Sequence, residues 1–109
     1  MYCDRWIEMV NYYRDQLMLP VALEKDWFVE FQISPTGYLS VADVSRSSRQ
    51  PSRGLGITIT LEVADIQHYW QHCDNKGMMP TEIKHHLWGA WQFFLVDPEG
   101  HRLEIWQQI

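Results

Sequence analysis

The chain lacks several features that would assign it to a large class of proteins. It has no run of about 18 apolar residues and no basic segment leading into an apolar one, which disfavours a membrane span and a secretory signal. Its two cysteines, Cys3 and Cys73, are too few for a disulfide scaffold, so we expect free thiols. The net charge of -5 disfavours a nucleic-acid partner. These absences predict a cytoplasmic protein with no membrane partner.

Common catalytic signatures are also missing. The sequence contains no Ser-His-Asp signature, no phosphate-binding glycine loop and no Cys-x-x-Cys pair. His68 and His72 are four residues apart, a spacing that can bind metal, but they point away from the apolar face of their expected helix. We interpret them as a surface pair. His85 and His86 lie near an expected cleft mouth, and their position alone gives only a weak case for a general base.

What the chain does contain predicts a single domain over residues 1–109, built from two similar halves. Apolar residues recur at helical spacing over residues 5–17, where Asp4 is placed as the N-cap, and over residues 65–76, before Gly77. Strands are expected at residues 21–23, 27–33, 37–42, 57–63, 79–84, 91–96 and 102–107. A four-residue turn with Pro and Gly occupies the same place in each half, at 34–37 and 97–100, so the chain is interpreted as a tandem repeat.

The segment between the halves and the start of the first half lead to two further expectations. Half 1 covers about 1–43 and half 2 about 57–109, and the polar segment 44–56 is expected to be a mobile linker. Its arginines, Arg46, Arg49 and Arg53, either clamp an anionic ligand or, as we favour, belong to a solvated loop. Only three residues precede Asp4, where half 1 should have a strand. Either the reading frame begins upstream of Met1 or the strand is truncated and exposes a sheet edge, which favours a homodimer.

The end of the chain carries the strongest functional signal. The segment 97–100, Asp-Pro-Glu-Gly, has turn chemistry and predicts a hairpin. After the turn Leu103 and Ile105 alternate with Arg102, Glu104 and Trp106, which places the latter three on one face of the last strand. Six tryptophans and five tyrosines are many for 109 residues, and we expect some of them to line a pocket and the others to fill the core.

This ending resembles that of the glyoxalase, bleomycin resistance protein and extradiol dioxygenase superfamily, the vicinal oxygen chelate (VOC) fold. Residues 10–20 also look like the family's first helix and its exit, although Met18 stands where a glycine is common. Residues 59–66 look like the strand that enters the second helix. The resemblance implies an α+β fold of paired βαβββ units that form a curved, cleft-bearing mixed sheet, here with the first strand truncated, and it implies a dimer.

Enzymes of this family hold a divalent metal in a cup of strands, and this chain offers few of the ligands. Glu104 is the one residue that matches. The fifth-strand position falls on Thr58 or, shifted by two, on Thr60, and neutral hydroxyls are poor ligands. The fourth strand, residues 38–42, offers no His or carboxylate. Since a catalytic ion needs three or more protein ligands, we expect no metal and no other cofactor.

The leading hypothesis is therefore small-molecule binding or sequestration, with a flat aromatic ligand held against aromatic rings, as in the antibiotic-binding members of the family. The expected ligand-binding residues are Glu104, Trp106, Arg102, Thr58, Thr60, Trp91 and Trp88. Glu104 is also the only candidate for a catalytic role. One alternative is a metal-dependent lyase, isomerase or dioxygenase whose missing ligands come from an upstream segment or a partner chain. A second alternative is a stand-alone interaction module. The ligand's identity is not encoded in any motif of the chain.

Overall fold

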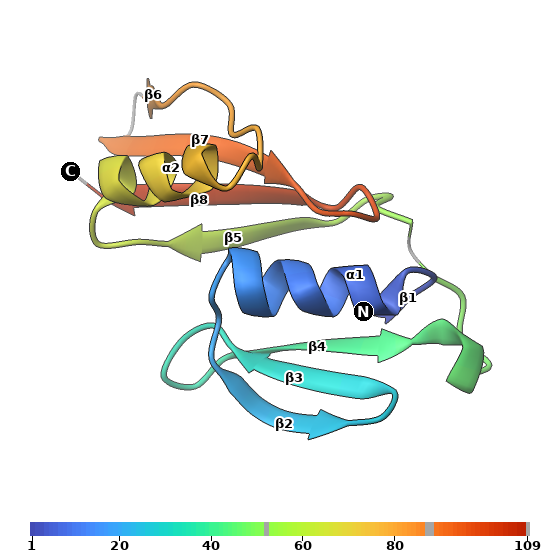
Figure 1. The fold of residues 1–109 in the computed structure, drawn as a ribbon. Coiled ribbons are helices and arrows are strands. Elements are labelled where there is room, and N and C mark those ends of the chain that lie inside the picture. Colours follow the sequence, from blue (N-terminus) through green and yellow to red (C-terminus); the bar gives the residue numbers. More distant parts are fainter. Residues whose placement is uncertain (52, 87–88, 109) are drawn as a thin grey trace.

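The structure is a computed structural model that describes residues 1–51, 53–86 and 89–108, and it contains two units of similar design (Figure 1). The elements of the first unit are β1 (Tyr2–Cys3), α1 (Trp6–Asn11), the π-helix η1 (Tyr12–Gln16), β2 (Val21–Lys25), β3 (Phe28–Gln32) and β4 (Tyr38–Asp43). The elements of the second unit are β5 (Thr58–Glu62), α2 (Ile66–Asn75), β6 (Lys84–His86), β7 (Ala90–Val96) and β8 (Arg102–Gln108). Within the described ranges no helix is long and apolar enough to cross a membrane.

Each unit forms its own four-stranded mixed sheet, with the orders β1-β4-β3-β2 and β5-β8-β7-β6. The first strand of each unit pairs in parallel with the last, and the remaining neighbours are antiparallel. The α+β fold of two βαβββ units is confirmed, and so is the truncation of the first strand. Because β1 has two residues, it covers β4 only at Ala42 and Asp43.

The first helix differs from the prediction in its start and in its second half. Asp4 is not its N-cap: Arg5 holds that position without a side-chain capping bond, and the Asp4 carboxylate pairs with Arg53 at 3.2 Å. From Tyr12 onward the helix widens into η1, where Leu17 N donates to Tyr12 O at 2.9 Å. The hydrogen bonds of a π-helix join residues five apart instead of four. The spacing of apolar residues in the sequence predicts a helix but does not show this local change.

The expected strand over residues 79–84 is wrong for most of its length, since β6 contains only Lys84–His86. Met79 adopts a left-handed backbone with φ 57° and Pro80 follows it, a pair of residues that interrupts an extended run. Thr81 still bonds to β7, with its N donating to Phe94 O at 3.0 Å, and its own O accepts from Trp70 Nε1 at 2.8 Å.

Segment 44–56 is partly ordered by contacts with both units. Val44–Arg46 forms a short 3-10 helix, η2, that Asp43 caps through Ser45 N. Farther along, Gly54 has φ +78°, and a Cβ there would lie 2.5 Å from the backbone of Gly100. Only glycine fits this approach, so the segment is seated on the β7–β8 turn at Gly54.

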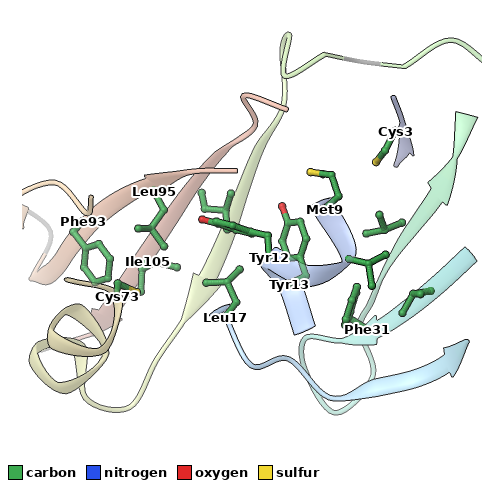
Figure 2. Close-up of a cluster of buried hydrophobic side chains, with 14 of the residues drawn as sticks. Cys3, Met9, Tyr12, Tyr13, Leu17, Phe31, Cys73, Phe93, Leu95 and Ile105 are labelled. Atoms are coloured by element: carbon green, nitrogen blue, oxygen red, sulfur yellow. The ribbon is translucent and has the colours of Figure 1, made fainter. Parts of the chain in front are cut away.

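The two helices share one hydrophobic core between the two sheets (Figure 2). Val29, Phe31 and Val41 of the first sheet pack on α1, and the buried residues of β7 and β8 pack on α2. Tyr12 and Leu17 extend this core from the first helix to the second unit. Because helices cover the inner face of each sheet, the other face of each sheet is directed outward.

Both cysteines are free thiols in this core, as predicted. Burial raises the pKa of Cys3 to about 12 and that of Cys73 to about 11, so both remain protonated at neutral pH. We therefore assign them to packing.

The turn at 97–100 joins the two units. The buried Asp97 carboxylate accepts from Tyr13 Oη of the first unit at 2.7 Å and from His101 N of its own hairpin at 2.9 Å. The Glu99 carboxylate accepts from Asp4 N at 3.2 Å and Arg5 N at 2.8 Å, at the start of the first helix. The residues that form the predicted hairpin therefore also hold the units together.

We expect Asp97→Asn to lower the free energy of unfolding by about 3 kcal/mol, because an amide nitrogen then faces donors that are buried with it. Urea denaturation followed by tryptophan fluorescence measures the loss. Asp74→Asn on the exposed side of α2 is the control and should change stability by about 0.5 kcal/mol or less. Equal stability of the two variants would contradict the assigned role of Asp97.

Met18→Gly should stabilise the fold by about 1 kcal/mol. Met18 follows η1 with φ 60° and a 65% exposed side chain, so the substitution relieves left-handed strain and removes little packing. Gly77→Ala is the inverse control, because Gly77 has φ 71° at the corresponding place after α2. This substitution should lower the stability of the fold by a similar amount. Thermal unfolding of both variants tests the pair, and a lower melting temperature for Met18→Gly would contradict the prediction.

Candidate functional site

The outward face of the second sheet brings together most of the residues predicted to bind a ligand. Strand register aligns them in three rows across β5, β8 and β7. The rows are Thr58–Arg102–Val96, Thr60–Glu104–Phe94 and Glu62–Trp106–Gln92. We call these nine residues the open face. Alternation along each strand directs them away from the buried Leu103 and Ile105.

Glu104 occupies the centre of the open face, with Thr60 on one side and Phe94 on the other. Arg102 shares this face of β8 but does not form an ion pair with Glu104. The Arg102 guanidinium instead lies over the Phe94 ring, 3.8 Å from its centroid. This distance is that of a cation–π contact, and Arg102 remains exposed.

Trp106 is half-buried at one end of the open face. Its neighbours across the strands are Glu62 and Gln92. Glu62 is exposed and lies at the β5 end of this row. The intermediate burial of Trp106 leaves part of its side chain accessible to a ligand.

The structure does not bring Trp91 to this group. In β7 it alternates with Gln92 and Phe94, so it shares the side of the buried Phe93 and not that of Trp106. There it is 40% exposed and packs against His85, with ring centroids 4.8 Å apart. Trp88, the other tryptophan of the prediction, lies outside the described residues.

Sequence reasoning missed the contribution of β7 to the open face. Its residues there are Gln92, Phe94 and Val96. The run Phe93-Phe94-Leu95-Val96 is apolar throughout, so it gives no alternation to read, and only pairing with β8 shows which side each residue takes. Within that run the predicted core residues Phe93 and Leu95 are buried.

The predicted surface pair on α2 is only half correct. His68 is exposed, whereas His72 is partly buried and its Nε2 lies 2.8 Å from Gln16 O at the end of η1. Tyr69 makes a similar contact, donating from Oη to Leu17 O at 3.2 Å. These two side chains bond carbonyls that the end of a helix leaves unsatisfied, which explains why His72 turns toward the first unit.

Comparison with known proteins identifies the family. The description "Glyoxalase/Bleomycin resistance protein/Dioxygenase superfamily" matches residues 1–105. The chain belongs to this superfamily. No curated protein sequence matches the chain.

Solved structures of this glyoxalase superfamily and of related proteins share the fold at low identity. A lactoylglutathione lyase from Agrobacterium tumefaciens is 18% identical and matches 98% of this chain and 88% of its own, with a TM-score of 0.78. A glyoxalase/bleomycin resistance protein/dioxygenase from Alicyclobacillus acidocaldarius is 16% identical and matches 100% and 87%, with a TM-score of 0.73. A protein of unknown function from Agrobacterium tumefaciens str. C58 is 22% identical and matches 99% and 89%, with a TM-score of 0.78. These likenesses establish the fold.

The donor atoms of the open face do not fit the metal site expected in a glyoxalase-type enzyme. Glu104 supplies a carboxylate at the family position, but its neighbour Thr60 supplies a neutral hydroxyl, and Glu62 lies one row away. Across the described residues no group of three or more His, Cys, Asp or Glu side chains is placed to hold a metal ion. A single central carboxylate is too few ligands for a catalytic divalent ion.

We therefore expect the purified chain to retain less than one equivalent of Zn²⁺, Ni²⁺, Mn²⁺ or Fe²⁺ after incubation and desalting. Elemental analysis measures the retained metal, and Glu104→Gln is the control that separates specific from surface binding. Stoichiometric retention that Glu104→Gln abolishes would overturn the expectation.

Proposed function

We propose that this protein binds a small planar aromatic molecule on the open face and sequesters it without chemical change. Family membership supports small-molecule handling in general, and the open face supports the particular location. It combines a stacking ring, a central carboxylate, an exposed guanidinium and two threonine hydroxyls on a face that no helix of the described chain covers.

The observation that carries this proposal is the position of Trp106 next to Glu104. A half-buried tryptophan, held on the rigid strand β8 with its ring at the surface, loses little conformational freedom when a flat ligand stacks on it. The Glu104 carboxylate, one row away, supplies a directional contact of the kind that fixes a ligand's orientation.

A metal-dependent lyase, isomerase or dioxygenase is the alternative. Its support is Glu104, which stands at the family's last-strand carboxylate and faces outward, and the fold shared with a lactoylglutathione lyase. In that case the missing ligands would come from an upstream segment or from a partner chain. Metal retention by the full chain separates this alternative from simple binding.

A homodimer is part of the proposal, because the sheets have edges and faces that a second copy can cover. β5 is an edge strand, and β1 covers only the end of β4. The outward face of the first sheet adds Tyr38, which is 51% exposed, and the partly buried Phe28 and Glu30. A second copy that placed this face against the open face would turn an exposed surface into a cleft.

Light scattering at micromolar concentration tests the dimer, with an expected mass of twice the 13.0 kDa of one chain. A monomer under these conditions would contradict the proposed assembly. It would leave ligand binding by the open face as a separate question.

Trp106→Ala should weaken binding of a planar ligand by about tenfold, since it removes both the ring contact and its buried area. Removal of a core aromatic side chain typically lowers the free energy of unfolding by about 3 to 5 kcal/mol, and Trp106→Ala should lower it by less. A thermal-shift screen of planar aromatic compounds supplies the ligand, and tryptophan fluorescence titration gives the affinities.

Trp91→Ala is the matched control, because Trp91 lies on the opposite side of the same sheet and should leave the affinity unchanged. If the two variants bound the ligand as well as the wild type, and Trp106→Ala lost as much stability as a core variant, Trp106 would be a packing residue and the proposal would fail.

A further inference from the structure

Arg102 and Glu104 are opposite charges on one strand face that do not neutralise each other. They are two residues apart on β8, so their Cα atoms are separated by about 7 Å at roughly 3.4 Å per residue. Among the described residues neither side chain forms an ion pair or a side-chain hydrogen bond. The contact that Arg102 does make places its guanidinium over the ring of Phe94, the β7 neighbour of Glu104, without forming an ion pair with Glu104.

The surroundings reinforce this separation of charge along the face. The row of Arg102 contains only the uncharged Thr58 and Val96, which leaves the guanidinium as its single charge. On the other side of Glu104, the next row adds Glu62. Lys84, at the far edge on β6, is aligned with Gln92 and lies two strands from Trp106. The open face is thus positive on the β7 side, where the guanidinium covers Phe94 and Lys84 lies beyond Gln92, and negative at Glu104 and at Glu62 on the β5 side.

We infer that the ligand is a planar zwitterion, with an anionic group at Arg102 and a cationic group at Glu104. This inference rests on the proposed function and specifies the chemical class of the ligand. A carboxylate meets the exposed guanidinium of Arg102, which the contact with Phe94 keeps on this face. A protonated amine meets the Glu104 carboxylate, and the Trp106 side chain in the next row offers the ring of the ligand an aromatic neighbour.

A ligand with a single charge forms only one of these contacts and meets repulsion or an unpaired charge at the other. An anion alone is attracted by Arg102 but repelled by the nearby Glu104. A cation alone is attracted by Glu104 but repelled by Arg102. The two side chains therefore favour a ligand that carries both charges at a suitable distance, in addition to a planar ring.

Four para-substituted benzenes test the inference. 4-(Aminomethyl)benzoate carries both charges, 4-(aminomethyl)benzamide only the cation, 4-methylbenzoate only the anion, and 4-methylbenzamide neither. Fluorescence titration with the full chain should give the tightest binding for the zwitterion, with a loss of about fivefold for each charge removed.

Two variants assign the charges to their partners. Arg102→Gln should weaken 4-(aminomethyl)benzoate about fivefold and leave 4-(aminomethyl)benzamide unchanged, and Glu104→Gln should weaken both of these and leave 4-methylbenzoate unweakened. Arg49→Gln in segment 44–56 and Glu24→Gln on β2 are the controls and should change nothing.

Three results would overturn the inference. Equal affinity for all four compounds, lost on Trp106→Ala, would leave the proposed binding function intact and reject charge selection. Tighter binding of a singly charged compound than of the zwitterion would show that the ligand belongs to a different chemical class. Binding of none of the four would reject the zwitterion, and the function itself would fail only if the wider thermal-shift screen were also negative.

Discussion

The structure depends on the buried carboxylate of Asp97. It bonds Tyr13 Oη across the two units and the backbone of its own hairpin, and its Oδ2 lies 2.9 Å from His101 Nδ1. Burial and the adjacent Asp97 charge raise the pKa of Tyr13 well above its usual value, so its hydroxyl stays protonated and continues to donate. One side chain thus fixes both the turn between β7 and β8 and the position of the first helix.

This joint also determines where a ligand can bind. Tyr13 and Glu99 attach the first helix to the second unit, and α2 packs on β7 and β8. The outward faces are then the available binding surfaces, and β8 starts directly after the turn. The joint lies directly between two strands of the open face in the sequence: Asp97 and Glu99 follow Val96 of β7 and precede Arg102 of β8.

Much of this arrangement follows from the sequence, and the exceptions have physical causes. The turn at 97–100, the helix expected over 65–76 and the Leu103/Ile105 alternation are local signals, and the structure bears them out. The cap at Asp4 failed because the Asp4 carboxylate pairs with Arg53 instead, while the distant Glu99 accepts from the N–H groups of Asp4 and Arg5. Likewise, Trp91 and Trp106 are both tryptophans in neighbouring strands, but they lie on opposite sides of the sheet. Only the strand register distinguishes them.

The central claim is that the open face is where a ligand binds, and amide chemical shifts locate binding most directly. A ¹⁵N-labelled protein titrated with the tightest planar compound should show its largest shift changes along β5 and β8, at the residues from Thr58 to Glu62 and from Arg102 to Trp106. Changes confined to α2 or to segment 44–56, with β5 and β8 unaffected, would contradict the account.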